Sequence, residues 1–341
     1  MRNKTGASDV LSHLTRERLA ELESRPRTPM RVFIDYIVCF MPIISGLLAL
    51  FEYLYIPNLK GNSSTSTYTY FLAVLILLAG IFFIVSFFSR KVFYVLRYKA
   101  PFYAFLFLLL MAYDWLTLKT GRLVLPYFTW TDEILNAMWD DRAYLLDCTI
   151  NSLKLLFTGY LTGAILGLIT GVACGCSRTA DYWISPFIKL VGAIPSPTWI
   201  PIVMVIASTL FSGAVFIIAL GVWYSLTIAT ITGIRNIDRS YYDAAKTLGA
   251  SSMRLVLNVA VPNILQGLTQ GMSSACLVLI TAEMVGVESG LGWYVSWQKS
   301  WAQYGKMYAA IVVLCIVFIA VNWGLNAVKR RLLRWQEGIT E

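Results

Sequence analysis

Long apolar segments constrain the fold of this chain more than any other feature of its sequence. About 20 apolar residues in a helix are enough to cross the roughly 30 Å hydrocarbon core of a membrane. Eight stretches reach that length, namely residues 32–57, 68–89, 99–118, 148–176, 186–210, 212–234, 260–284 and 306–328. We therefore expect an all-α polytopic membrane protein with eight transmembrane helices.

The composition supports this class and excludes several others. The chain of 341 residues is 57% hydrophobic and only 14% charged, which is too few charges for a soluble protein of this size. Cys174 and Cys176 are too close for the usual C-x₂-C metal spacing, and no histidine lies near them. We expect no metal site and interpret the six cysteines as small buried residues. The single histidine, His13, lies in the polar N-terminal segment, which excludes a serine protease triad or a zinc hydrolase site inside the membrane.

Basic residues alternate between the two sides of the expected membrane. With the N-terminus inside, the cytoplasmic segments hold Arg90, Lys91, Arg97, Lys99, Arg178, Arg235, Arg239, Lys246, Arg254, Lys329, Arg330, Arg331 and Arg334. The outer segments hold only Lys60, Lys119, Arg122, Arg142, Lys299 and Lys306. Cytoplasmic loops carry an excess of Lys and Arg, so residues 1–30 and 331–341 are expected to be cytoplasmic tails. No cleaved signal sequence is recognisable in residues 1–30.

The polar segment between the sixth and seventh spans, residues 235–262, has the pattern of two short helices. Ser240 and Asp243 form a potential capping box, and Gly249 can end the first helix. A second helix is expected to run until Pro262 forces a break or a new start. A DNA-binding helix-turn-helix has a similar pattern, but the flanking spans leave no room for a separate soluble domain. We therefore expect a cytoplasmic docking loop and no nucleic-acid binding.

This loop resembles the signature of the permease subunits of bacterial ABC importers that use a soluble binding protein. That signature reads Glu-Ala-Ala, three residues, Gly, nine residues and Ile-x-Leu-Pro. The matching residues here are Asp243, Ala244, Ala245, Gly249, Val259 and Val261-Pro262, at the same spacing and with conservative replacements. The shorter Asp243 puts in doubt a salt link that the usual Glu would reach. The resemblance implies that the ATPase contacts lie at Tyr242, Asp243, Ala244, Ala245, Leu248, Gly249 and Pro262.

Three further stretches extend the resemblance over about residues 99–330. They are Ile150–Lys154, Ala193–Pro201, and Ala282–Gly286 with Ser289–Gly292. The subgroup that the chain looks most like imports sulfonates, nitrate, bicarbonate, or thiamine-precursor and riboflavin-type compounds. The resemblance implies that residues 99–330 form the six-helix type I importer core, with two additional membrane helices in residues 31–98. It also implies a bacterial inner-membrane location and an extracytoplasmic solute-binding protein as partner.

The chain lacks the phosphate-binding motif G-x-x-x-x-G-K-[ST]. If transport is driven by ATP, hydrolysis and its Mg²⁺ belong to a separate ATPase, so we expect no enzyme activity and no cofactor in this chain. An ATPase dimer offers two docking grooves, and this chain has one docking loop. Two copies of the chain, related by a two-fold axis, are therefore expected to bind two ATPase subunits.

Several residues are candidates for the translocation pathway, each with a structural alternative. Pro195 and Pro197, with Pro201, should break the fifth span near its cytoplasmic side beside Trp199, either as a gate or as a kink. Glu283, at the outer end of the seventh span, could line the pathway or hydrogen-bond the Gly290–Gly292 hairpin. Lys154 could attract an anion or extend to the outer interface.

Two further patterns concern packing. Gly159, Gly163, Gly167 and Gly171 recur every four residues and give one face of the fourth span a surface that another helix can approach closely. Trp293, Trp297 and Trp301 are typical of an interfacial aromatic belt.

The alternative function is a secondary transporter or channel driven by an ion gradient. Such a protein would carry paired charges inside its spans, whereas the Asp and Glu residues here lie almost wholly at span ends. Inverted repeats, common in such carriers, are also not evident. A membrane-embedded enzyme would need a catalytic constellation, and the sequence offers none.

Overall fold

The computed structural model describes residues 29–236 and 252–333, and all regular structure in these residues is helical. Contacts divide the chain into two compact units that meet between Leu123 and Val124. We describe each unit by itself. The sequence placed the boundary between the additional helices and the importer core after residue 98. The structure groups the third expected span with the first two in one compact unit.

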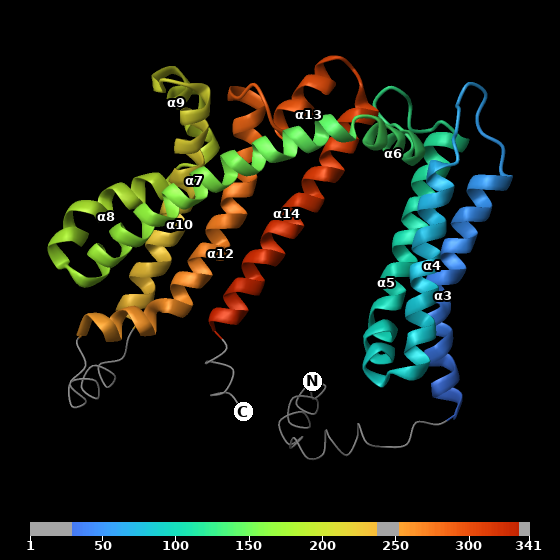
Figure 1. Ribbon diagram of the computed structural model, residues 1–341, viewed down its shortest axis with the longest axis horizontal. Coiled ribbons are helices and arrows are strands. Elements are labelled where there is room, and N and C mark those ends of the chain that lie inside the picture. Colours follow the sequence, from blue (N-terminus) through green and yellow to red (C-terminus); the bar gives the residue numbers. More distant parts are fainter. Residues whose placement is uncertain (1–28, 237–251, 334–341) are drawn as a thin grey trace, which may run out of the picture. The chain divides into compact units, whose positions relative to one another are not determined.

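Unit 1 contains three long helices (Figure 1). They are α3 (Pro29–Tyr55), α4 (Thr67–Phe88) and α5 (Arg90–Asp114), and a short π-helix, η1 (Trp115–Lys119), continues α5. α5 packs mainly along α3 and less closely along α4. The Lys119 ammonium donates hydrogen bonds to the Tyr53 and Ile56 carbonyls, at 2.9 and 2.6 Å. It therefore satisfies backbone acceptors at the end of α3 that have no partner within the helix.

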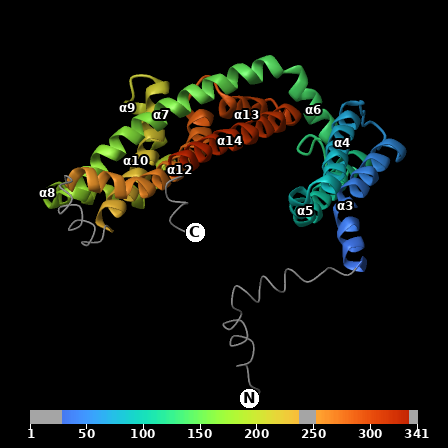
Figure 2. The same ribbon diagram turned by 60° about the horizontal axis from the view of Figure 1, so that its bottom comes forward.

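Unit 2 contains the remaining helices. They are α6 (Thr131–Asp140), α7 (Arg142–Cys176), α8 (Arg178–Ala193), η2 (Ser196–Trp199), α9 (Ile200–Ile206), α10 (Leu210–Arg235), α12 (Ser252–Gly286), α13 (Leu291–Ser300) and α14 (Tyr304–Leu332). α10 packs between α7 and α12 along most of its length, and these helices lie side by side in both Figure 1 and Figure 2. α13 packs against α14, which also contacts α6 and α12.

The expected number of spans is largely confirmed. Among the described residues, seven helices are long and apolar enough to cross a membrane, and a bent pair makes up to eight. Most of these helices extend beyond the apolar stretch that predicted them. α5 begins at Arg90 rather than at residue 99, for example, because a helix can continue through polar residues outside the hydrocarbon core.

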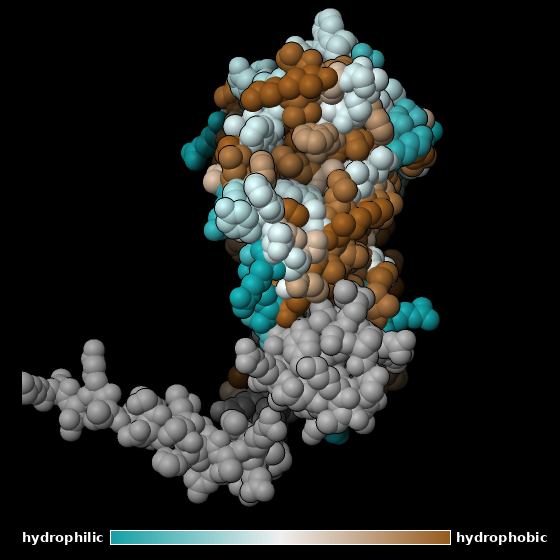
Figure 3. Space-filling model, turned by 90° about the vertical axis from the view of Figure 1, so that its left-hand side faces the viewer, coloured by the Kyte–Doolittle hydropathy of each residue, from teal (hydrophilic) through white to brown (hydrophobic). Residues whose placement is uncertain are grey.

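The fifth expected span, residues 186–210, is not one continuous helix. α8 and the segment Ser196–Ile206 are bent by 94° at the break between them. α8 begins at Arg178, before the apolar stretch that starts at residue 186. Its start is capped by the Ser177 hydroxyl, which accepts a hydrogen bond from the Ala180 amide. α8 is amphipathic and carries exposed Tyr182, Trp183 and Phe187. Apolar residues gather on the side of unit 2 seen in Figure 3.

Two other expectations are wrong. Pro262 does not break the helix, because α12 runs through it from Ser252 to Gly286. Membrane helices tolerate proline where neighbouring groups compensate for the missing backbone donor. Of the six cysteines, Cys176 and Cys315 are exposed rather than buried, whereas the other four are buried. The two exceptions lie on helix surfaces that no other described element covers.

Candidate functional site

The contact between α7 and α10 depends on glycines that follow one face of α7. A Cβ atom on Gly159 would lie 2.7 Å from the Ile218 Cβ, and one on Gly163 would lie 2.9 Å from the Ala219 Cα. Gly167 and Gly171 make equally close approaches to α10, and Gly175 continues the series. The predicted small face of the fourth span is therefore a helix contact, and α10 is its partner.

Polar side chains also join these two helices. The Trp223 indole N–H donates a hydrogen bond of 3.0 Å to the Thr170 hydroxyl, which lies 2.9 Å from the Thr227 hydroxyl. Thr227 in turn donates to the Gly167 carbonyl at 3.3 Å. Inside a membrane such bonds add to the close packing of small residues.

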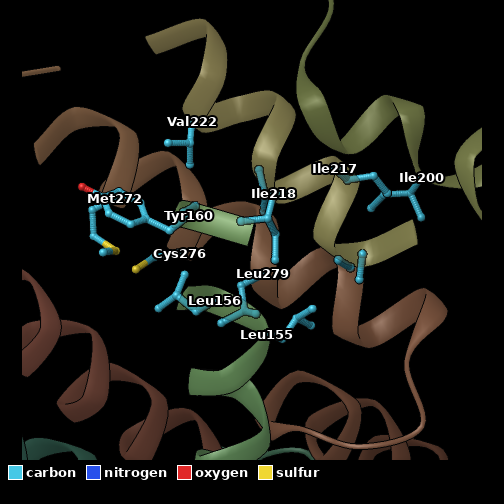
Figure 4. Packing of buried hydrophobic residues seen from close by; sticks show 14 residues of the cluster. Leu155, Leu156, Tyr160, Ile200, Ile217, Ile218, Val222, Met272, Cys276 and Leu279 are labelled. Atoms are coloured by element: carbon cyan, nitrogen blue, oxygen red, sulfur yellow. The ribbon is translucent and has the colours of Figure 1, made fainter. Parts of the chain in front are cut away.

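The opposite side of α10 approaches α12 with similar closeness. A Cβ atom on Gly267 would lie 2.5 Å from the Ala229 Cβ, and one on Gly233 would lie 2.8 Å from the Asn263 Cβ. A hydrophobic core lies between these helices (Figure 4), with residues from α7, α9, α10 and α12. We call α7, α10 and α12 the central bundle. Its close contacts favour movement as one body, because packed interiors are not continuously deformable.

The parts of α10 and α12 that flank the predicted docking loop are held together. Ile234 of α10 and Ala260 of α12 are buried in one small apolar cluster, with Val172 of α7 packed against it. Arg235, the last residue of α10, forms a 2.8 Å ion pair with Asp181 of α8. Its guanidinium also donates to the Cys174 carbonyl at 3.2 Å. Both flanks of the loop are thus fixed to the central bundle.

Most of the predicted ATPase contacts lie outside the described residues. These are Tyr242, Asp243, Ala244, Ala245, Leu248 and Gly249. Pro262 is described, and it lies half-buried in α12, two residues after Ala260.

The proline-rich break lies against the middle of α10. Ser196 follows Pro195, and its hydroxyl lies 3.2 Å from the position of a Cβ on Gly221, halfway along α10. The sequence predicted a break at these prolines, and α8 ends at Ala193 directly before them; the place of the break near the cytoplasmic side stays a prediction. Broken backbone at this depth is tolerated only against protein or a water-filled space.

The side chains of the break differ in exposure. Pro195 is exposed, whereas Pro197 and Trp199 are half-buried. The Trp199 indole nitrogen is buried and has no hydrogen-bond partner among the described residues. A buried donor without an acceptor is costly, so Trp199 marks a position where a further polar group would be stabilised.

Glu283 lies at the end of the central bundle that is opposite the predicted docking loop. It is 1% exposed, and its carboxylate accepts a 2.7 Å hydrogen bond from the Gly292 amide. The Ser152 hydroxyl of α7 also hydrogen-bonds Glu283 and accepts a 2.8 Å bond from the Leu291 amide. The hydrogen bond to the Gly290–Gly292 hairpin that the sequence suggested is present.

The glycines beside Glu283 are required by this packing. Gly290 has a φ of 129°, and a side chain there would overlap the Glu283 carboxylate. A Cβ on Gly292 would lie 2.9 Å from the Glu283 Cβ. The carboxylate therefore fixes the start of α13 against α7 and α12.

The structure does not bring Lys154 to this carboxylate. Lys154 lies two residues after Ser152 on α7 and is exposed, and residues two apart point to roughly opposite sides of a helix. Lys154, Glu283 and the proline-rich break therefore form three separate places. Among the described residues, no group of His, Cys, Asp or Glu could hold a metal ion.

Of the three tryptophans, Trp293 and Trp297 lie in α13 and Trp301 directly follows it. The rings of Trp293 and Trp297 are stacked with centroids 5.4 Å apart, and Trp301 follows at 6.1 Å. Trp297 and Trp301 are exposed. Their place as an interfacial belt stays a prediction.

A polar contact that the sequence did not reveal joins α7, α13 and α14. The Tyr294 hydroxyl donates a 2.6 Å hydrogen bond to Asp141, and the Lys306 ammonium lies 2.9 Å from the same oxygen. Partial burial raises the pKa of Asp141, but the bonds from Tyr294 and Lys306 outweigh it, so the pKa falls below its ordinary value of 3.8. These residues are far apart in the chain and have no common local pattern.

This contact predicts a pH-dependent contribution to stability. A carboxyl whose pKa is lower in the folded state stabilises it above the unfolded pKa, and loses that effect as pH falls through the folded pKa. We expect Asp141→Asn to lower the unfolding temperature at pH 7, and the difference to be much smaller at a pH well below 3.8, where the carboxyl is protonated in the folded state as well. Asp140→Asn, at the neighbouring exposed position, is the control. A difference of equal size at both pH values would show that charge plays no part.

Comparison with known proteins gives a consistent result. Residues 163–334 match the model of the family described as binding-protein-dependent transport system inner membrane component. A Bacillus subtilis protein, SsuC, named as a candidate aliphatic sulfonates transport permease, is 28% identical over 182 residues, covering 52% of this chain and 66% of the relative. The Escherichia coli taurine transport system permease TauC is 26% identical over 188 residues, covering 54% and 68%.

A third relative is the bicarbonate transport system permease CmpB of Synechococcus elongatus, which is 29% identical over 194 residues, covering 55% of this chain and 68% of the relative. The match to SsuC spans just under two thirds of that protein's length. The matched family segment includes α10, α12, α13 and α14 and the glycine face of α7 from Gly163. The chain therefore belongs to the family of inner-membrane components of binding-protein-dependent transport systems.

Proposed function

We propose that this chain is the permease subunit of an ATP-driven importer for a small oxyanion. Two copies would form the pathway, bind two ATPase subunits in the cytoplasm and receive the solute from an extracytoplasmic binding protein. Both chain termini would then be cytoplasmic, as the distribution of basic residues predicts. The ATPase subunits would supply ATP and Mg²⁺ chemistry.

The observation that carries the proposal is the attachment of both loop flanks to the central bundle. Ile234 and Ala260 share one apolar cluster, and Arg235 is paired with Asp181. A force applied to residues 237–251 would therefore reach α10 and α12 together rather than unwind either helix. Rigid elements that shift between two arrangements are what alternating access requires.

The proline-rich break is the proposed gate of the translocation pathway. It lies against the middle of α10, where the Ser196 hydroxyl is 3.2 Å from the position that a Cβ on Gly221 would occupy. Movement of α10 would therefore act directly on this segment. The buried Trp199 indole N–H has no hydrogen-bond partner among the described residues and would donate to an anion that reached it, and exposed Lys154 offers a positive charge on α7.

The substrate class follows from the relatives. Their names record aliphatic sulfonates, taurine and bicarbonate as transported solutes. These solutes carry sulfonate or carbonate oxygens, which accept hydrogen bonds from indole N–H groups and lysines. We propose the same chemistry for this chain, with the binding protein selecting among such anions.

The proposed docking of the ATPase is tested by co-purification with candidate ATPase subunits. Gly249→Asp places a charge at the predicted turn, and we expect it to release the ATPase while the permease remains folded. Gly61→Asp is a matched control, because Gly61 has the positive φ, here 100°, that is predicted for Gly249, lies outside residues 235–262 and has no atom within 4 Å of its Cβ position. Retention of the ATPase by Gly249→Asp, or equal loss in both variants, would contradict docking at this loop.

A further inference from the structure

Unit 1 contains an apolar cavity that the transport function does not use. It has a volume of about 790 Å³ and lies between α4 and α5, with Pro42 of α3 at its base. A volume of this size is typical of ligand pockets, about 300–1,000 Å³. Lys91 and Lys99 are the charged residues among those that line it. The cavity is therefore an apolar groove with basic residues along one part.

The groove exists because α4 diverges from α5. α5 packs closely along α3 and less extensively along α4, so apolar side chains of both helices remain uncovered. Leu78 and Phe82 of α4 are 45% and 56% exposed, and Val95 of α5 is 56% exposed. The groove thus faces the surroundings of the protein along its length.

The groove follows α5 from Lys91 to Leu110, both of which line it. This part of α5 rises about 28 Å at about 1.5 Å per residue, which is close to the roughly 30 Å of the hydrocarbon core. Lys91 lies about two turns before Lys99, on the side where a lipid headgroup would be.

The two lysines have charge available for a ligand. Arg97, between them in the sequence, forms a 2.6 Å ion pair with the largely buried Asp35. Lys91 and Lys99 are exposed, and neither has an ion pair among the described residues. A long lysine side chain can keep its stem on apolar surface while its ammonium reaches the headgroup region.

We propose that this groove binds one anionic phospholipid, with an acyl chain between α4 and α5 and the phosphate near Lys91 and Lys99. The two unpaired lysines favour an anionic lipid over a transmembrane helix of another protein, because a helix with an apolar surface would leave both charges without a partner. The distribution of basic residues places the lysines at the cytoplasmic side, so the lipid belongs to the inner leaflet. The proposal does not depend on the proposed transport function.

The experiment is lipid retention by the full chain, measured by native mass spectrometry after exchange with phosphatidylglycerol or phosphatidylcholine. We expect the wild type to retain one phosphatidylglycerol more tightly than phosphatidylcholine. The double variant Lys91→Gln/Lys99→Gln should bind phosphatidylglycerol roughly 30-fold more weakly, given the usual contribution of a lysine near an anionic surface. Arg330→Gln/Arg331→Gln, which removes the same charge from exposed positions at the end of α14, should leave retention unchanged.

A second variant tests the groove itself without changing charge. Ala79→Trp fills the groove, because Ala79 lines it and is half-buried, and it should abolish retention of the tightly held lipid. Equal retention of the two lipids by the wild type would overturn the proposal, as would equal losses in the two charge variants. A photo-crosslinker at position 78 should capture lipid, and capture of a polypeptide instead would identify a helix as the occupant.

Discussion

Replacing Gly163 by leucine is expected to prevent stable packing of the central bundle. A Cβ atom there would lie 2.9 Å from both the Ala219 Cα and the Val222 Cβ, so backbone as well as side chain would have to move. Overpacking a well-filled core costs about 1–3 kcal/mol and sometimes more, and an immovable backbone places this site at ~3 kcal/mol or above. The measurement is the unfolding free energy in detergent, with the yield of folded protein.

Gly80→Leu is the matched control for this substitution. Gly80 lies in the middle of α4, and nothing lies within 4 Å of its Cβ position. Removing a glycine from a helix interior stabilises it by about 0.5–1 kcal/mol in the comparison with alanine, so a small change of either sign is expected. A similar, large loss in both variants would mean that leucine perturbs any glycine site, and the close α7–α10 contact would then not be the cause.

Replacing Glu283 by alanine is expected to release the start of α13. It leaves the Gly292 amide and the Ser152 hydroxyl without their buried acceptor. An unsatisfied buried polar group costs about 1–3 kcal/mol, so we expect a loss of about 2–4 kcal/mol. Hydrogen exchange of the Leu291 and Gly292 amides should accelerate by roughly 30-fold or more.

The same experiment distinguishes the structural role of Glu283 from a role in the pathway. Glu288→Ala removes a nearby exposed carboxylate and should change neither exchange nor solute uptake. If Glu283→Ala abolished uptake while the amides kept their protection, the carboxylate would act on the solute rather than on the loop.

Hydropathy predicted most of the fold because membrane spans have a strong local signal. The bent fifth span was the exception. α8 is amphipathic, and its polar residues lower the mean hydropathy of the segment. Three prolines indicated a break there but not its angle of 94°, because the angle depends on how the segment packs against α10. The glycine period predicted a packing face on α7 without identifying α10 as its partner.

The candidate site was predicted less completely. Glu283 and the Gly290–Gly292 hairpin were recognised, but Ser152, which joins them, lay in a stretch noted only for its resemblance. The ion pair between Arg235 and Asp181 joins two helices, and no local pattern reveals such pairs. The same holds for Asp141 and Lys306. Tertiary contacts of this kind follow from the fold, and the sequence alone does not specify them.

Reconstitution tests the central claim most directly. The chain, its ATPase subunits and a binding protein are placed in vesicles, and the uptake of labelled taurine, an aliphatic sulfonate and bicarbonate is measured. The account predicts uptake of at least one of these anions that requires ATP hydrolysis and persists when ion gradients are collapsed. Uptake by the chain alone, driven by a proton or sodium gradient and indifferent to ATP, would contradict it and identify a secondary transporter.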